Sequence, residues 1–350
     1  MKGKKLKIWT EKDYLDWVKQ ETPLKEKYFA MYSTVWDAVV TNPNLMTIPF
    51  DDHMVHRGDG VFDNSLVVNG KVYLLDEHLD RIIRSATAIG IKIPLSKQEM
   101  KDIILETIAI TGKRDCMARF WISRGTGGFS VYPDESPKGH FYLIITSSPN
   151  YPARYYEEGL SVVTSPFPLR QPFTPQVKSC NYLANAMMEF FAHNVGADTA
   201  IAIDSEGYLT EGSNKNVAIV TRDGIFKYPR LEKVLHGTML KRAIYFANLL
   251  KGEGILKDVI STDIPISEAY NSAEMMFFST TLIVAPIVKY DGITIGDGKP
   301  GEIYKRLREM FKKDMTENSE VLTPIIKPIP RIFFTISPCL SFSFKSLSRR

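Results

Sequence analysis

Apolar residues in the first half of the chain follow two spacings, one typical of strands and one typical of helices. The stretch LVVNGKVYLL, residues 66–75, places apolar runs on either side of Asn69-Gly70. Because an Asn-Gly pair accepts the positive φ angles of a tight turn, this stretch predicts a β-hairpin. Apolar residues then recur at positions 79, 82, 83, 86 and 89, which is helical spacing. A second helix is predicted from its cap Ser96 to Gly112.

The remaining sequence continues this mixture of helices and strands, without an internal repeat. Residues 11–33 predict a polar, loosely amphipathic helical lead-in. Further elements are expected as strands in 116–128, 139–148 and 160–168, an apolar helix after residue 178, a meander of short strands in 197–229, a helix in 237–254, a buried strand and hairpin in 267–301, and a final amphipathic helix in 302–315.

The length of 350 residues predicts two domains. The stretch SSPNYPARYYEEG has turn residues and no periodicity, so it predicts a linker. We therefore expect a small N-terminal domain over 1–150, a linker over 151–160 and a larger domain over 161–323. Residues 324–350 are rich in Pro, Ser and Phe and contain no acidic residue, which predicts a disordered tail.

Composition narrows the class of protein. The apolar share of 44% and the charged share of 24% are those of an ordinary globular protein. A net charge of +4 does not indicate a nucleic-acid or membrane partner. The three cysteines, Cys116, Cys180 and Cys339, are too few for a disulfide framework and show no CxxC spacing, so no metal site is expected. No apolar run approaches the ~20 residues of a membrane span, and we expect a cytoplasmic protein.

One lysine stands between a proline-containing loop and an apolar helix. Lys178 lies in TPQVKSCNYLANAMMEFFAH, residues 174–193. It could be a solvated lysine at a helix start, and this segment alone favours that interpretation. A helix N-terminus is, however, an unfavourable place for a cation. A lysine amine enclosed by apolar side chains would instead suit nucleophilic chemistry on a carbonyl.

Other residues supply what a phosphorylated pyridine cofactor needs. Glu211, where an apolar strand meets a glycine turn, could be a solvated turn carboxylate or the partner of a pyridine nitrogen. Gly237-Thr238 at a predicted helix start could be a simple cap or a phosphate site. Arg81 could add a fixed positive charge. The hydroxyl donors after a predicted strand are Ser279, Thr280 and Thr281. Lysine, carboxylate, helix start and arginine together match pyridoxal phosphate (PLP).

At this point the sequence resembles the class IV, or fold-type IV, PLP-dependent aminotransferases. That family includes branched-chain aminotransferases, D-amino acid aminotransferases and aminodeoxychorismate lyases. The matching stretches run in family order over about residues 45–310. They are HRGDGVFD, DEHLDRIIRSA, VKSCNYLANAMM, LTEGSNKNVAIV, VLHGTMLKRAI, EMMFFSTTLIVAPIV and DGITIGDGKPG.

The resemblance implies a fold, a cofactor and a site. The fold would be α+β, with a small α/β N-terminal domain and a larger C-terminal domain built on a β-barrel-like core. Lys178 would be the catalytic Schiff-base lysine and Glu211 the partner of the pyridine nitrogen. Asn216 would support the loop. The remaining cofactor-binding residues would be Arg81, Tyr182, Gly237, Thr238, Met239, Ser279 and Thr280.

The resemblance also implies an activity and leaves its substrate open. The activity would be transamination between a branched-chain or D-amino acid and a 2-oxo acid, in a homodimer. The stretch SRGTGGFSVYP keeps Arg124 but lacks the Arg/His pair with which D-amino acid enzymes hold the carboxylate, and the sequence looks closest to the plant-type branch. The expected substrate-binding residues are Phe62, Arg124, Phe129 and Thr281, with Tyr132 beside them. The alternative is an aminodeoxychorismate lyase that releases pyruvate with the same Lys178 and Glu211.

Overall fold

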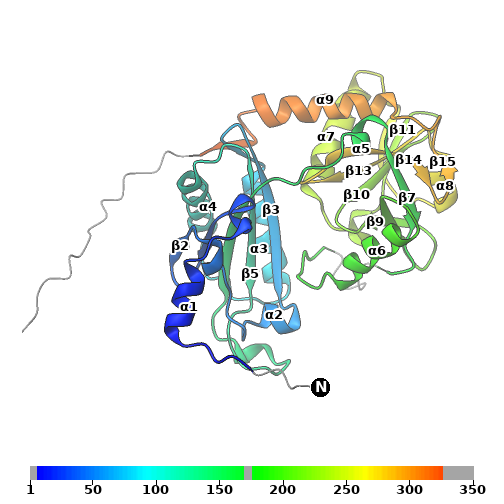
Figure 1. Cartoon of the computed structure of the whole chain (residues 1–350). Coiled ribbons are helices and arrows are strands. Elements are labelled where there is room, and N and C mark those ends of the chain that lie inside the picture. Colours follow the sequence, from blue (N-terminus) through cyan, green and yellow to red (C-terminus); the bar gives the residue numbers. More distant parts are fainter. Residues whose placement is uncertain (1–5, 169–175, 326–350) are drawn as a thin grey trace, which may run out of the picture.

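The computed structural model describes residues 6–168 and 176–325, and it is built from two β-sheets with helices packed on them. Figure 1 shows the two sheets side by side, the first from the N-terminal half and the second from the C-terminal half. The long helix α9 (Glu302–Glu317) lies along the second sheet and leads the chain back to the first. Mixed helix and strand content around a barrel-like sheet confirms the predicted fold class.

The first sheet contains seven strands in the order β16-β4-β3-β5-β6-β1-β2, and all neighbours are antiparallel. Helices α3 (Leu75–Ala88) and α4 (Lys97–Thr111) pack on it and share its hydrophobic core. The strands are β1 (Tyr28–Ser33), β2 (Ala38–Val40), β3 (Gly60–Val68), β4 (Lys71–Tyr73), β5 (Cys116–Ser123), β6 (His140–Thr146) and β16 (Leu322–Pro324).

The second sheet closes on itself. Its strand order ends at β9, and β9 also pairs with β10, so β10-β13-β14-β7-β8-β9 form a six-stranded barrel. One core cluster fills the barrel, and another lies between the barrel, α7 and α9. The strands of this sheet are β7 (Leu160–Thr164), β8 (Thr199–Ile203), β9 (Leu209–Gly212), β10 (Asn216–Val220), β11 (Ile225–Tyr228), β12 (Asp258–Ser261), β13 (Glu274–Ser279), β14 (Ile283–Tyr290) and β15 (Ile293–Thr294).

The helices follow the amphipathic segments of the sequence. They are α1 (Glu11–Val18), α2 (His53–Arg57), α3 (Leu75–Ala88), α4 (Lys97–Thr111), α5 (Arg154–Glu157), α6 (Leu183–Asn194), α7 (Thr238–Gly252), α8 (Ile266–Tyr270) and α9. The hairpin turn and one helix match their predicted signals closely. Asn69 and Gly70 have φ angles of 50° and 77°, and α4 is capped by Ser96 and ends at Gly112 with a φ of 66°.

Three segments differ from the expectations. The predicted helix over 11–33 ends early, because Tyr28–Ser33 form the strand β1 between β6 and β2. The predicted linker 151–160 contains the short helix α5 and the first residue of β7. Pro324 belongs to β16, which pairs with β4, so the predicted tail begins inside the first sheet. The rest of that tail, 326–350, lies outside the described residues.

Candidate active site

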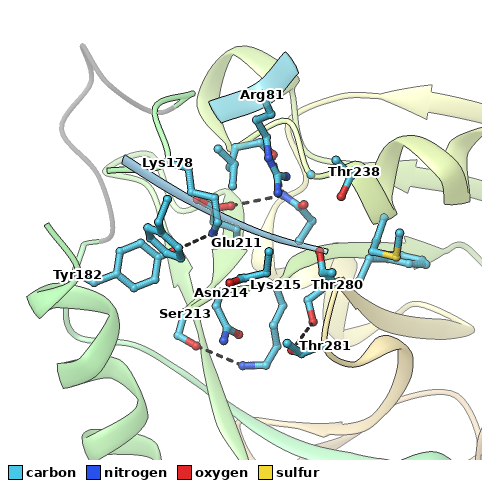
Figure 2. Close-up of a pocket in the computed structure, with 18 of the residues that line it drawn as sticks. Arg81, Lys178, Tyr182, Glu211, Ser213, Asn214, Lys215, Thr238, Thr280 and Thr281 are labelled. Carbon is cyan, nitrogen blue, oxygen red and sulfur yellow. Dashed lines mark hydrogen bonds between the residues drawn. The ribbon is translucent and has the colours of Figure 1, made fainter. Parts of the chain in front are cut away.

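A cavity of about 210 Å³ opens between the two sheets. Eleven of the thirteen residues predicted for the site line it. They are Phe62, Arg81, Lys178, Tyr182, Glu211, Gly237, Thr238, Met239, Ser279, Thr280 and Thr281. Figure 2 labels several of them, among them Lys178, Glu211 and Thr238, around the cavity. Segments more than 200 residues apart in the sequence therefore meet in one place.

Lys178 lies in an extended segment beside the start of β3. The amide of Phe62 donates to the carbonyl of Lys178 at 3.0 Å, and the amide of Cys180 donates to the carbonyl of Gly60 at 2.8 Å. Helix α6 begins only at Leu183, so Lys178 is not in its first turn, contrary to the expectation from the sequence. The residue is only 6% exposed, because the two sheets meet around it.

The amine of Lys178 faces two aromatic rings. Its Nζ lies 4.4 Å from the centre of the Phe62 ring and donates a hydrogen bond to the hydroxyl of Tyr182 at 3.0 Å. The rings of Phe62 and Tyr182 pack edge to face, with centres 4.9 Å apart. This arrangement fixes the position of the amine and keeps bulk water away from that side.

Glu211 is a buried carboxylate on the strand β9. It pairs across the barrel closure with Asn216, whose Nδ2 donates to Glu211 Oε2 at 3.3 Å and to the carbonyl of Leu235 at 2.9 Å. Asn216 thus joins Glu211 to the loop that precedes α7. The carboxylate is positioned by the backbone of the barrel and needs no movement to face the cavity.

The start of α7 forms a concave wall of the cavity. The first amides of a helix have no acceptor within the helix, and no side chain caps this helix start. The hydroxyl of Thr238 is buried without a hydrogen-bond partner. A Cβ atom on Gly237 would lie 1.8 Å from Asn216 Oδ1, so only glycine fits there without displacing Asn216. A helix start with a buried, unpartnered hydroxyl is a suitable place for a phosphate.

Arg81 projects from α3 toward the same wall. Its Nε and Nη2 donate to the two oxygens of Asp63 at 2.8 and 2.7 Å, and its Nη1 donates to the carbonyl of His236 at 3.3 Å. Asp63 is fully buried, and burial alone would raise its pKa, but Arg81 and His78 hold that pKa well below its usual value. Arg81 is therefore held in one orientation next to the start of α7.

The turn between β13 and β14 closes another side of the cavity. Ser279 Oγ accepts a hydrogen bond from the amide of Leu282 at 3.2 Å, which shapes the turn. Thr281 Oγ1 lies 3.0 Å from the hydroxyl of Tyr151, a residue of the segment that joins the two sheets. The turn is thereby tied to the connection between the two halves of the molecule.

Two predicted substrate residues lie elsewhere. Arg124 does not line the cavity, because its guanidinium binds Asp59 and the carbonyls of Ile89 and Gly90. Phe129 is 56% exposed and packs against Phe50 and His56. Tyr132, which was placed beside them, is exposed as well. Sequence proximity to a strand end does not bring these side chains to the cavity.

Seven of the described residues that line the cavity are not predicted from the sequence. They are Asn64, Arg119, Ser213, Asn214, Lys215, Leu235 and Phe278, whereas Asn216, predicted as a support of the loop, lines the cavity as well. Asn64 and Arg119 are opposite each other on β3 and β5. Burial lowers the pKa of Arg119, whose Nε donates to Thr146 at 3.3 Å. Because side chains alternate along a strand, Asn64 lies on the same face of β3 as Phe62. Arg119 is the residue of β5 opposite Asn64, so a known register between the two strands would have identified it.

The comparisons with known proteins agree with this site. The family model of amino-transferase class IV matches residues 60–290. The chain is 38% identical over 291 residues to the chloroplastic D-amino-acid transaminase of Arabidopsis thaliana, covering 83% of this chain and 77% of that protein. It is 33% identical over 270 residues to a putative branched-chain-amino-acid aminotransferase of Methanocaldococcus jannaschii, covering 76% and 90%.

Solved structures show the same fold. The branched-chain amino acid aminotransferase of Escherichia coli superimposes with a TM-score of 0.79 at 22% identity, covering 86% of this chain and all of that one. The corresponding enzyme of Thermobaculum terrenum, in its PLP form, gives 0.75 at 19% identity, covering 86% and 99%. The chain belongs to the class IV aminotransferases and is a PLP-dependent transaminase. This confirms the predicted family, and it favours transamination over the lyase alternative.

The residues in the cavity fit PLP. The partnerless Thr238 hydroxyl, the start of α7 and Arg81 suit a phosphate, and buried Glu211 suits a pyridine nitrogen.

In the parts of the chain that the structure describes, no group of three His, Cys, Asp or Glu side chains could hold a metal ion. None of the helices in those parts is long and apolar enough to cross a membrane.

Proposed function

We propose that Lys178 is the residue of this transaminase that binds the cofactor carbonyl and carries the substrate proton. The observation behind the proposal is that one cavity holds a buried lysine amine, a buried carboxylate and a buried, partnerless hydroxyl at a helix start. When bound, PLP withdraws electrons from the substrate Cα–H bond. Lys178 Nζ would accept that proton from the substrate Cα, and the Tyr182 hydroxyl would hold the amine in position.

Glu211 and the residues around the start of α7 have separate roles in this proposal. Glu211 keeps the pyridine nitrogen protonated, and Asn216 holds the carboxylate in place. Arg81, Gly237, Thr238 and Met239 bind the phosphate, together with the hydroxyls of the β13–β14 turn, Ser279 and Thr280. The cofactor would thus be held at its ring nitrogen and at its phosphate, and Lys178 Nζ would be free to bind its carbonyl.

The substrates we propose are an amino acid, either a D-amino acid or a branched-chain one, and a 2-oxo acid. The two sequence relatives are named for those two classes. Every such substrate has an α-carboxylate. Among the described residues that line the cavity, the cations are Arg81, Arg119, Lys178 and Lys215. Arg81 is assigned to phosphate, Lys178 to chemistry, and Lys215 binds Glu189, so Arg119 is the described cation left for the carboxylate. Arg119 with Asn64 therefore suits the carboxylate, while Phe62 offers an apolar surface to the side chain.

A donor and acceptor panel tests this function. The PLP-loaded protein is incubated with D- and L-alanine, D- and L-methionine, and L-leucine, each with pyruvate and with 2-oxoglutarate. We expect conversion of the bound cofactor to its amine form by at least one donor, read from absorbance, and formation of the matching 2-oxo acid. If every amino acid leaves the spectrum unchanged while 4-amino-4-deoxychorismate yields pyruvate, the lyase alternative replaces this proposal.

We also propose that the enzyme is a cytoplasmic homodimer. Two observations support a partner surface and a reducing compartment. Leu183 and Phe190 on α6 are 76% and 62% exposed and seven residues apart, so they share an apolar helix face. Cys116 and Cys180 are free thiols. Light scattering on the purified protein would measure the mass, and a monomer at micromolar concentration would contradict the dimer.

A further inference from the structure

One face of α6 contacts two separate parts of the cavity. Tyr182, which directly precedes the first turn of α6, and the helix residues Asn185 and Glu189 are spaced by three and four residues, so they lie in one row along the helix. Tyr182 accepts the hydrogen bond from Lys178 Nζ at 3.0 Å. Asn185 Nδ2 donates to the carbonyl of Ser213, and Glu189 accepts from Lys215 Nζ at 2.9 Å. The row therefore connects Lys178 with the turn between β9 and β10.

Glu189 and Lys215 are the centre of a compact polar cluster. Glu189 Oε1 also accepts from Thr199 Oγ1 at 2.7 Å and from the hydroxyl of Ser213. Lys215 Nζ donates in addition to Thr199 Oγ1 at 3.0 Å and to Ser213 Oγ at 3.2 Å. Figure 2 shows Ser213 and Lys215 together at one side of the cavity. The cluster fixes the turn from both its backbone and its side chains.

The charges of this pair are interdependent. The side chain of Lys215 is 9% exposed and that of Glu189 is 42% exposed. Burial lowers the pKa of Lys215, and Glu189 opposes that shift. Burial acts to raise the pKa of Glu189, but Lys215 and the hydroxyl donors lower it overall. Removing either partner would leave the other charge partly buried without compensation, whereas removing both would not.

The turn that this pair holds is continuous with Glu211. The amide of Gly212 donates to the carbonyl of Lys215 at 2.7 Å and closes the turn directly after Glu211. A shift of the turn would therefore move the carboxylate relative to Lys178. Lys215 itself is unsuited to act as a second nucleophile, because three acceptors hold its amine.

We propose that Glu189 and Lys215 are positioning residues that set the placement of Glu211 relative to Lys178. The pair acts through the β9–β10 turn and the row on α6, and neither side chain takes part in proton transfer. This inference rests on the roles proposed above for Lys178 and Glu211. It assigns a reason for a half-buried ion pair beside the cavity, where such a pair specifies geometry more than it adds stability.

The test compares Lys215→Met, Glu189→Gln and the double variant with the wild-type protein. The measurements are kcat, KM for the amino donor, the dissociation constant of PLP from fluorescence, and the absorption spectrum of the bound cofactor. We expect each single variant to lower kcat about tenfold, with a changed spectrum but KM and PLP affinity within about threefold of wild type. The double variant should be no worse than the worse single variant, because no unpaired charge remains.

Two controls separate positioning from general destabilisation. Lys215→Arg keeps the charge and should restore most of kcat. Lys227→Met removes a comparable ion pair, Lys227 with Glu268 at 2.6 Å, outside the cavity, and should leave kcat and the spectrum unchanged. The inference is wrong if the single variants lower only thermal stability while kcat and spectrum stay at wild-type values. Turnover by Lys178→Ala would instead refute the proposed function.

Discussion

At the scale of single residues, the site depends on how Lys178 is enclosed. A lysine side chain has four rotatable bonds, and ordering it costs up to ~2 kcal/mol of conformational entropy. Here the cost is offset by the burial of the side chain, by the Phe62 ring and by the Tyr182 hydroxyl. The amine is thus held in one position before any substrate arrives, as the proposed proton transfer requires, and positioned groups lower activation barriers.

We predict that Lys178→Ala lowers turnover by at least about 10²- to 10⁴-fold, the usual contribution of a positioned proton-transfer group. The fold should persist, because alanine leaves the backbone pairing of 178–180 with β3 intact. Transamination rate, cofactor absorbance and circular dichroism are the measurements. A small exogenous amine such as methylamine should restore part of the rate. Near wild-type turnover without added amine would contradict the role of Lys178.

We predict that Glu211→Gln weakens catalysis more than cofactor binding. Glutamine has the same shape and can still accept from Asn216, but it carries no charge to keep a pyridine nitrogen protonated. We expect kcat to fall by about a hundredfold and PLP affinity to change by less than about tenfold. Stopped-flow measurement of each half-reaction and PLP titration would check this. Loss of cofactor with normal turnover after resaturation would contradict it.

At the scale of elements, the start of α7 is where sequence and site meet most directly. The φ angle of Gly237 is −65°, which any residue can adopt, so its backbone conformation does not require glycine. Glycine is required because a Cβ atom at this position would clash with Asn216 Oδ1. The same close approach brings Asn216 to the carbonyl of Leu235 and to Glu211. Asn216 therefore fixes the position of the Glu211 carboxylate relative to the start of α7.

We predict that Gly237→Ala lowers PLP affinity about tenfold or more, because Asn216 or the helix start must move to relieve the contact. Gly252→Ala, at the other end of α7, is the matched control: a Cβ there has no neighbour within 4 Å, so binding should not change and stability should rise by up to ~1 kcal/mol. Affinities for PLP and for unphosphorylated pyridoxal should both be measured. Equal losses for the two ligands would exclude a phosphate-specific effect.

The elements also show what local sequence could and could not predict. Caps and turns are local, so Ser96, Gly112 and Asn69-Gly70 were predicted correctly. The sequence predicts helix where β1 lies, because the polar segment before it continues a helical pattern, whereas the pairing of β1 with β6 involves residues more than 100 positions away. Lys178, Glu211 and Arg81 could be placed by motif order. Arg119 and Lys215 could not, because their exposure to the cavity depends on strand register and on the closure of the barrel.

At the scale of the whole molecule, the cavity requires the two sheets to keep a fixed relation. The chain crosses from the first sheet to the barrel through residues 147–159 and returns through α9 to β16. At this return, Tyr73 of β4 donates to Asp314 Oδ2 of α9 at 2.5 Å, and Arg242 of α7 donates to the same oxygen at 2.8 Å. Asp314 thus connects the first sheet with α7 and α9 of the second half.

We predict that Asp314→Asn lowers the free energy of unfolding by about 3 kcal/mol, because it leaves Arg242 partly buried without its counter-charge. Tyr73→Phe removes one hydrogen bond from the same carboxylate and should cost only ~1 kcal/mol. Urea unfolding followed by fluorescence measures both. If the two halves separate in Asp314→Asn, this variant should release PLP at a lower urea concentration than the one that unfolds the barrel. If Asp314→Asn is less stable but keeps PLP until the barrel unfolds, the connection through Asp314 does not control the cavity.

The pH dependence of the stability difference between wild type and Asp314→Asn gives an independent check. Burial acts to raise the pKa of Asp314, but Arg242, Tyr73 and Asn318 lower it overall. A carboxyl whose folded-state pKa is depressed contributes stability above its unfolded pKa of about 3.9 and loses that contribution as pH falls through the folded value. The stability difference between wild type and Asp314→Asn should therefore be constant from pH 8 to about pH 5 and shrink below about pH 4. A difference that grows on acidification would contradict the ionised state of Asp314 in the folded protein.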